Sequence, residues 1–459
     1  MPQPVGASYR DRGGRIYDLD GRIVRSVMPS AAGAYEAVRD AGLYDRWIGR
    51  GDLVGIEEVA APFQLDGEQP AYWLEHPRLP FVSHPYEWSF SLLKKAALLQ
   101  LDLHLEALAA GFSMSDATAF NVQFDGVRPV FIDQLSFRPY RDGEVWVGHR
   151  QFVMQYLGPL ILWSRLGIAP NAWFRGNLEG IPPEDLSALL PWHGGWSWTA
   201  LAHVKAQAAV QKRRTKAGWQ AEAHKERQLS KIGLEAMLSG LRRHIAGLQP
   251  VGGATVWSDY AGQTSYAEPE AEAKRAFVAR MAAAVRPGLM FDFGCNSGDY
   301  SFAALDGGAG RVIGFDFDFG ALEKAVARAE ASNAPLTPLW LDAVNPSPAQ
   351  GWAEAERAGF GSRARGDAMV ALALIHHICI GRNVPMAMCI DWLMATAPHG
   401  IIEFPPKSDP MVRQLLASRE DIFDDYSEES FIAEVTRRGR IVDQQHLSEG
   451  GRLLVRYER

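Results

Sequence analysis

The chain has 459 residues, of which 47% are hydrophobic, and a formal net charge of -7. Such a length exceeds what one hydrophobic core usually serves, so two or more domains are expected, and the apolar content excludes global disorder. The negative net charge does not favour sequence-independent nucleic-acid binding, so we expect a small molecule or another protein as the partner.

The three cysteines, Cys295, Cys379 and Cys389, lack the spacing of a disulfide framework or a zinc site, which indicates a reducing compartment. The N-terminus lacks the continuous apolar core of a signal peptide, and the longest apolar run, "FVMQYLGPLILW", is too short to span a bilayer. We therefore expect a cytoplasmic protein without direct membrane insertion. The sequence leaves its oligomeric state open.

Residues 1–200 combine short strand signals with helical stretches, which predicts an α+β domain. Apolar residues recur at helical spacing over 87–112, and the turn Asp125-Gly126 between two strand signals predicts a hairpin. Residues 201–250 are charged and rich in helix formers, which predicts a helical connector between two domains with a solvated face. The strand signals lie at 21–27, 52–59, 71–77, 120–124 and 129–135.

Strands and helices alternate over 251–459, which predicts a doubly wound (Rossmann-like) α/β domain with helices on both faces of a parallel sheet. Its first strand runs into the glycine turn of "LMFDFGCNSGDYS". Ligands of such sheets lie outside the carboxyl ends of the strands, where the strand order reverses. Gly294 and Gly298 let the backbone approach a ligand, and the helix amides beyond them favour an anionic group.

The spacing Asp292-x-Gly294-x-x-x-Gly298 differs from the Gly-x-Gly-x-x-Gly of dinucleotide sites. It resembles the first motif of the class I S-adenosylmethionine-dependent methyltransferases, acidic-x-Gly-x-x-x-Gly. Asp316 then closes the second strand, where the ribose of a nucleoside needs a carboxylate. Asp342 closes the third strand and matches the position from which this family contacts the adenine amino group. The resemblance implies an S-adenosylmethionine site made of Asp292, Gly294, Asn296, Gly298, Asp316, Asp342 and Tyr266.

Three of these residues also have a purely structural explanation. Gly294 could serve helix–sheet packing, Asp316 could cap the next helix, and Asp342 could belong to a turn. Lys274, ahead of the glycine turn, is expected on the surface of a helix.

The fourth strand leads into "IHHICIG", so this architecture places His376 and His377 beside the methyl acceptor. A neutral imidazole can accept a proton during transfer, and a buried, hydrogen-bonded histidine is the alternative for either residue. The segments 345–352 and 403–411 are expected as loops that close over the acceptor. The C-terminal sequence further resembles the nodulation-type and polysaccharide-locus methyltransferases of bacteria, a group that leaves the acceptor open.

The first domain sets Asp116, Asn121 and Asp133 at intervals of five and twelve residues. This arrangement resembles the lobe of protein kinases and aminoglycoside phosphotransferases that holds a catalytic base and two metal ligands. The resemblance implies Asp116 as base and Asn121 and Asp133 as metal ligands if the domain is an active kinase. No metal is expected otherwise.

The first domain departs from the kinase pattern at several positions. Gln134-Leu135 follows the last aspartate, and no glycine-rich nucleotide loop is visible. Arg25 stands where the phosphate-pairing lysine belongs, with Glu36 as a candidate partner on the next helix. We therefore expect a kinase-like fold without demonstrated phosphotransfer. The alternatives are, in order, a coincidence of spacing in an unrelated α+β domain and an active kinase.

Together these patterns predict a bacterial enzyme that transfers a methyl group from S-adenosylmethionine to a small-molecule or carbohydrate-like acceptor. The N-terminal domain is expected to assist substrate recognition. The alternatives are a bifunctional kinase-methyltransferase that caps a glycan, a catalytically inactive regulatory or binding protein, and a dinucleotide-dependent oxidoreductase.

Overall fold

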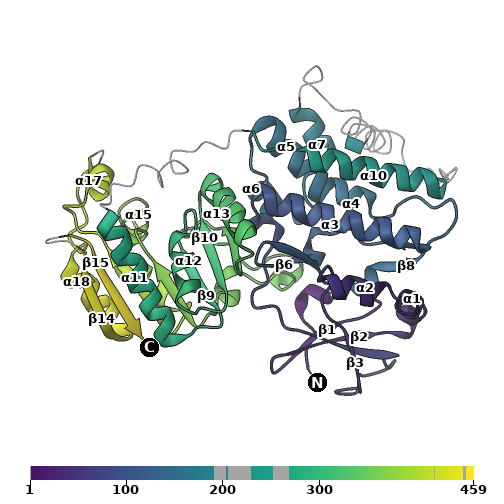
Figure 1. The fold of residues 1–459 in the computed structure, drawn as a ribbon, viewed down its shortest axis with the longest axis horizontal. Helices are drawn as coiled ribbons and strands as arrows, with labels where there is room; N and C mark the ends of the chain where they lie inside the picture. Colours follow the sequence, from purple (N-terminus) through teal and green to yellow (C-terminus); the bar gives the residue numbers. More distant parts are fainter. Residues whose placement is uncertain (1, 191–202, 205–228, 252–267, 418, 448–450) are drawn as a thin grey trace. The chain divides into compact units, whose positions relative to one another are not determined.

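The computed structural model describes residues 2–190, 203–204, 229–251, 268–417, 419–447 and 451–459. The chain divides into two compact units (Figure 1). Unit 1 comprises residues 1–252 and 349–357, and unit 2 comprises residues 253–348 and 358–459. Among the described residues, no helix is both long enough and apolar enough to cross a membrane.

Unit 1 begins with a four-stranded antiparallel sheet in the order β1-β2-β4-β3. Its first two strands meet at Asp20-Gly21, where φ is 51° and 98°, the left-handed conformation that a two-residue hairpin needs. Tyr17, Val24 and Trp73 form a hydrophobic cluster on this sheet. The strands are β1 (Ile16–Leu19), β2 (Arg22–Val27), β3 (Glu57–Val59) and β4 (Tyr72–His76).

The long helix α3 (Phe90–Ala109) lies in the core of unit 1 and confirms the helical spacing of this region. Helix α10 (Lys231–Gly247) packs along α3, and Arg242 Nη2 donates to Asp102 Oδ2 across the pair at 3.0 Å. The described part of the predicted connector is therefore packed against α3. Its buried side chains are Leu234, Leu238, Leu241 and Ile245.

Short elements surround α3. The predicted hairpin is confirmed: β6 and β7 pair on either side of Gly126, whose φ is 61°. The strands are β5 (Phe112–Met114), β6 (Val122–Asp125), β7 (Arg128–Phe131) and β8 (Phe137–Pro139). The helices are α1 (Pro29–Asp40), α2 (Leu43–Arg50), α4 (His149–Phe152), the π-helical turn Val153–Leu157, α5 (Gly158–Leu166), α6 (Asn171–Gly176) and α7 (Pro183–Leu189), with 3-10 turns at Gly6–Ser8, Pro85–Glu87, Ala119–Asn121 and Gln134–Ser136.

Residues 349–357 belong to unit 1, although the chain on either side of them belongs to unit 2. Arg10 Nε donates to the buried carboxylate of Glu356 at 2.9 Å, and the guanidinium of Arg357 lies 3.9 Å from the centre of the Phe120 ring. The expectation that 345–352 forms an acceptor loop is therefore wrong for residues 349–352, because these residues pack within unit 1.

Unit 2 is built on a seven-stranded sheet in the order β11-β10-β9-β12-β13-β15-β14. The pairs from β11 to β13 are parallel, and β15 is antiparallel to both of its neighbours. This sheet confirms the predicted doubly wound fold and adds a C-terminal antiparallel pair. The strands are β9 (Met290–Phe293), β10 (Val312–Asp316), β11 (Leu336–Trp340), β12 (Ala368–Ala371), β13 (His399–Phe404), β14 (Arg440–His446) and β15 (Leu453–Glu458).

Helices cover both faces of this sheet. Alternation along β9 sends Asp292 toward α12 on one face, where α11, α12 and α13 lie (Figure 1). Phe293 points to the other face and packs against Trp392 of α16, with ring centres 5.3 Å apart. The helices are α11 (Glu268–Val285), α12 (Asp299–Asp306), α13 (Phe319–Ser332), α14 (Phe360–Arg363), α15 (Ile375–Cys379), α16 (Met386–Met394), α17 (Pro410–Leu416) and α18 (Glu428–Arg438).

A network of buried charges centres on Glu403 in β13. Its Oε1 lies 2.7 Å from Lys274 Nζ and 3.2 Å from Arg452 Nη1, and its Oε2 accepts the backbone N–H of Ala373 at 2.7 Å. Arg452 Nε also donates to Asp409 at 2.7 Å. Two expectations are thus wrong: Lys274 is buried rather than on the surface, and Glu403 lies in a central strand rather than in an acceptor loop.

Replacing Glu403 by Gln should lower the free energy of unfolding of unit 2 by roughly 3 kcal/mol, because two buried cations would lose a shared carboxylate. Denaturant unfolding measures this cost. Glu428→Gln is the matched control, since that carboxylate is exposed where it meets His446, and its cost should stay within about 0.5 kcal/mol. Equal costs for the two variants would contradict a structural role for the network.

Candidate functional site

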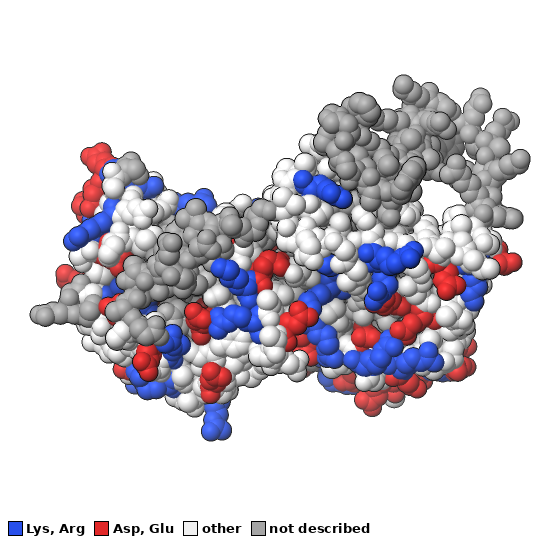
Figure 2. Space-filling model, turned by 45° about the horizontal axis from the view of Figure 1, so that its top comes forward, with Lys and Arg blue, Asp and Glu red and all other residues white. Residues whose placement is uncertain are grey.

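The charged side chains on one face of the molecule do not gather into a single-sign patch (Figure 2). Figure 2 shows Lys and Arg interspersed with Asp and Glu over the face that it presents. Within the described ranges, no three His, Cys, Asp or Glu side chains are arranged to hold a metal ion. The candidate site must therefore be located from the backbone and from buried polar groups.

The turn after β9 has the backbone of a ligand-binding loop. Gly294, Asn296 and Gly298 have φ values of 80°, 48° and 89°, and such left-handed residues open the turn. Gly298 caps α12 without a side-chain hydrogen bond, and the backbone N–H of Ser301 in the first turn of the helix faces Asp292. The backbone oxygen of Ser297 accepts a hydrogen bond from Arg328 Nη1 at 2.7 Å, which fixes the turn to α13.

Asp292 lies beneath this turn and is 1% exposed. Ser301 Oγ of α12 donates to its Oδ2 at 2.6 Å. Burial raises the pKa of Asp292 to about 7, and the hydrogen bond from Ser301 opposes that rise. The side chain is therefore placed to hold α12 against β9, which is a positioning role for the turn.

Asp316 closes β10 next to the glycine turn and is partly exposed. Its Oδ2 accepts the backbone N–H of Asn296 and its Oδ1 accepts that of Asp318, both at 2.8 Å. Burial raises the pKa of Asp316 to about 6 against these backbone hydrogen bonds. A carboxylate has about four acceptor positions, so each oxygen retains capacity for a further donor. The helix cap expected as an alternative is supplied by Asp318, whose Oδ1 accepts the N–H of Ala321.

Asp342 follows β11 at the same edge of the sheet. Its Oδ1 accepts the backbone N–H of Val344 at 3.1 Å, which is the turn contact foreseen as its structural role. Its Oδ2 lies 3.9 Å from Arg382 Nη2. The side chain thus has one firm contact and one loose ion pair.

The switch point of the sheet lies between β9 and β12. Phe293 and Ala371 are partners in the parallel register, so the turns that follow them emerge side by side. A Cβ on Gly294 would lie 3.7 Å from Leu372 O, which places the two turns in contact. Open α/β sheets bind their ligands in a crevice at this point, and the glycine turn, Asp316 and the start of α15 are the segments that would line it.

His376 and His377 lie on α15 with ring centres 4.1 Å apart. His376 is 1% exposed, and neither of its ring nitrogens has a hydrogen-bond partner within the described ranges. Burial lowers the pKa of His376 well below its usual range, with further lowering by His377, Arg452 and Lys274. Burial also lowers the pKa of the partly exposed His377. Tyr266, predicted for the cofactor site, lies outside the described residues.

No family model matches the sequence. The chain is 42% identical to the nodulation protein NoeA of Rhizobium meliloti (strain 1021) over 461 residues, which span 100% of this chain and 96% of that relative. The chain belongs to the NoeA family. This relationship confirms the predicted resemblance to nodulation-type proteins.

Solved structures show more distant likenesses to this NoeA-family chain. The N-methyltransferase NodS from Bradyrhizobium japonicum WM9 is 14% identical with a TM-score of 0.31, over 42% of this chain and 97% of NodS. The bifunctional kinase-methyltransferase WbdD is 16% identical with a TM-score of 0.29, over 44% of this chain and 41% of WbdD. At this distance neither likeness identifies a substrate of the NoeA-family chain.

In unit 1 of the NoeA-family chain, the structure brings the three kinase-like residues together. Asn121 Nδ2 donates to Asp133 Oδ2 at 3.2 Å. Asp116 Oδ1 accepts the backbone N–H of Thr118 at 3.0 Å, and burial together with nearby Asp133 raises its pKa. The spacing read from the sequence thus corresponds to one cluster of polar side chains.

The carboxylate of Asp133, expected as a metal ligand only in an active kinase, is surrounded by donors from the chain itself. Asp133 Oδ1 pairs with Arg25 and accepts the N–H of Leu135, and Oδ2 accepts from Asn121 and Ser136. These four donors use the acceptor capacity of one carboxylate.

Arg25 takes its partners from the acidic residues of this cluster. It pairs with Asp11 at 2.6 Å in addition to Asp133. The candidate partner Glu36 instead accepts a hydrogen bond from Tyr72 at 2.6 Å. The pairing of Arg25 with Glu36 considered from the sequence is therefore replaced by pairing with Asp11 and Asp133.

Arg25→Met should lower the melting temperature of unit 1, and millimolar Mn²⁺ should restore part of the loss, because a cation can then occupy the position of the guanidinium. Thermal unfolding with and without Mn²⁺ measures both effects. The wild-type protein is the control and should show no stabilisation by Mn²⁺. Equal stabilisation of wild type and variant would contradict an arginine-filled site.

Asp292 should make unit 2 less stable as pH rises from about 4 to about 7, because the folded state holds a proton in that window that the unfolded state releases. The cost is roughly 1.4 kcal/mol per pKa unit between the two states. Urea unfolding at several pH values measures the slope. Asp292→Asn should flatten it, and an unchanged slope in that variant would assign the effect to other groups.

Proposed function

We propose that unit 2 transfers a methyl group from S-adenosylmethionine to a small-molecule or carbohydrate-like acceptor. The observation that carries this proposal is the carboxylate of Asp316, whose Oδ2 accepts the backbone N–H of Asn296 in the glycine turn and whose Oδ1 accepts that of Asp318 in the turn after β10. The remaining positions suit the two hydroxyls of a ribose.

The other predicted cofactor residues fit the same ligand. Gly294, Asn296 and Gly298 give a turn that a nucleoside can approach, and the N-terminus of α12 favours a carboxylate such as that of a methionyl group. Asp342 retains acceptor capacity for an adenine amino group. Asp292 would act by holding the turn in place rather than by touching the ligand.

S-adenosylmethionine would supply a methyl group already activated by the sulfonium. The contribution of this chain is therefore to orient the acceptor and to exclude water. His377, which is partly exposed, is the better placed of the two histidines to touch the acceptor. His376 is buried and held neutral, so we assign it the wall of the crevice rather than the role of a base.

We further propose that residues 1–200 form a domain that assists substrate recognition without phosphotransfer. The support is the ion pair between Arg25 and Asp133, since phosphotransfer of the kinase type needs a metal at that carboxylate.

Asp316→Ala should weaken the binding of S-adenosylhomocysteine by roughly 10- to 100-fold, because two charge-assisted hydrogen bonds would be lost. Calorimetric titration measures the affinity, with NAD⁺ titrated in parallel to test the oxidoreductase alternative. Wild-type affinity should rise with pH through about 6 as Asp316 ionises, and Asp316→Asn should bind weakly at every pH between 5 and 7.

Asp391→Asn is the matched control, because that carboxylate is exposed and pairs with Arg438 on the surface. Its affinity for S-adenosylhomocysteine should equal that of the wild type. Unchanged affinity in Asp316→Ala would place the cofactor elsewhere, and binding of NAD⁺ alone would replace methyl transfer by hydride transfer.

A further inference from the structure

A pocket of about 540 Å³ lies beside the end of α15 in unit 2. Its volume is within the range typical of small-molecule sites. The segment from Gly381 to Asn383, which follows α15, forms one wall, and the segment around Arg419 and Phe423 forms the other. Gly381 N–H donates to His376 O at 3.1 Å, so the pocket is continuous with the helix that carries both histidines.

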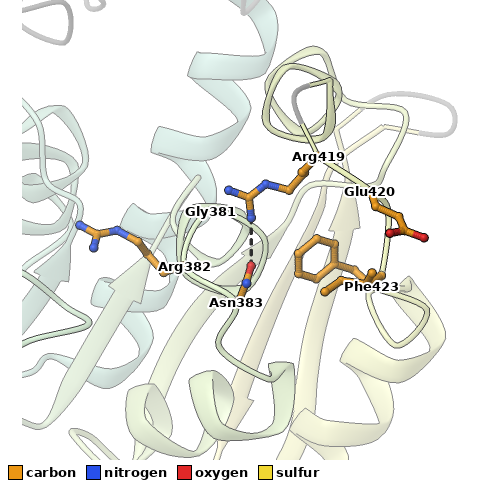
Figure 3. A pocket seen from close by; sticks show the side chains of 7 residues that line it. Gly381, Arg382, Asn383, Arg419, Glu420 and Phe423 are labelled. Atoms are coloured by element: carbon orange, nitrogen blue, oxygen red, sulfur yellow. Dashed lines mark hydrogen bonds between the residues drawn. The ribbon is translucent and has the colours of Figure 1, made fainter.

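Three groups converge on this pocket. Figure 3 shows the guanidinium of Arg419 and the ring of Phe423 turned toward Asn383, whereas Arg382 and Glu420 point away. Arg419 Nη1 donates to Asn383 Oδ1 at 2.9 Å and also to Ile380 O. Its Nε and Nη2 have no hydrogen-bond partner among the described residues, so one edge of the guanidinium fork is held and the other is available.

The pocket wall is anchored before any ligand binds. Asp421 pairs with Lys407 at 2.8 Å and accepts the backbone N–H of Phe423 at 3.1 Å. Tyr426 donates to Pro405 O at 2.8 Å. These contacts fix the segment that follows α17 and hold the aromatic ring in place, which reduces the entropy that a ligand must overcome.

The lining favours a particular chemistry. A fixed guanidinium fork matches the two oxygens of a carboxylate or a phosphate. Phe423 and Ile422, the latter 63% exposed, offer apolar surface for the C–H face of a ring. The side chain that adds a negative charge, Glu420, is directed away from the converging groups. The pocket therefore combines one positive charge, one amide and an apolar wall.

We propose that this pocket binds an acidic sugar residue of the methyl acceptor and that Arg419 pairs with the carboxylate or phosphate of that residue. The inference rests on the proposed function and adds to it a substrate class and a specificity-determining residue. The loose ion pair of Arg382 with Asp342 links the rim of the pocket to the predicted cofactor position. An acceptor held here would lie along the same edge of the sheet as the crevice.

The test is calorimetric titration of the full chain, saturated with S-adenosylhomocysteine, with four probes: D-glucuronate, D-glucose 6-phosphate, D-glucose and inorganic phosphate. Glucuronate or glucose 6-phosphate should bind at least about tenfold more tightly than either glucose or phosphate. The acid that binds better identifies the carboxylate or the phosphate as the natural group. Acids that bind no better than glucose would overturn the proposal, as would inorganic phosphate that binds as tightly as the preferred acid.

Arg419→Lys keeps the positive charge but removes the planar guanidinium, so it should weaken the binding of the preferred acid about tenfold. Arg437→Gln is the matched control, because that guanidinium is exposed on α18, where it pairs with Glu434, and the affinity of this variant for the acid should stay within about twofold. Equal losses in Arg419→Lys and Arg437→Gln would indicate only a diffuse positive field and would overturn the assignment.

The binding of S-adenosylhomocysteine in the same samples separates the two proposals. A wild-type protein that binds S-adenosylhomocysteine but no acid contradicts only the pocket, whereas a protein that does not bind S-adenosylhomocysteine contradicts the proposed function. Unchanged affinity for S-adenosylhomocysteine in Arg419→Lys shows that the variant is folded.

Discussion

The carboxylate of Glu403 is the contact on which the crevice of unit 2 depends. It is fully buried, and it accepts the N–H of Ala373, a residue with a left-handed φ of 49° in the turn after β12. Isolated, such a charge would be driven to protonate, but Lys274 and Arg452 keep it paired inside the protein. Because α11, β13 and the β12–α15 turn meet at this one side chain, the position of His376 follows from the packing of the whole sheet.

The sequence predicted the sheet of unit 2 from β9 to β13 because apolar residues recur with a clear period in its alternating strands and helices. It predicted the glycine turn because a positive φ favours residues such as Gly294. It missed the charged network, which joins residues far apart in the chain. Lys274 did leave a signal: it shares a helical face with the buried residues Val278 and Met281. A lysine on an apolar helix face indicates a buried partner, although only the fold shows that the partner is Glu403.

In unit 1, the spacing of polar residues in the sequence predicts a cluster but not all of its contacts. The distances in sequence between Asp116, Asn121 and Asp133 correctly predicted that the three would cluster. What they could not reveal was the partner of Arg25, since Asp133 is far from it in sequence, whereas the candidate partner Glu36 lies on the next helix and pairs with Tyr72 instead. The guanidinium of Arg25 supplies a positive charge to Asp133 as a fixed fork.

The two proposals about unit 2 together bear on the kind of methyl acceptor. Under the proposed function, the buried His376 is unsuited to act as the base, which leaves either His377 or a nucleophile that has no proton to lose at the moment of transfer. A carboxylate, a phosphate oxygen or an unprotonated amine meets the second condition. Positioning would then be the main source of rate enhancement, and the pocket of Arg419 and Phe423 would supply it by fixing one part of the acceptor while another part reacts.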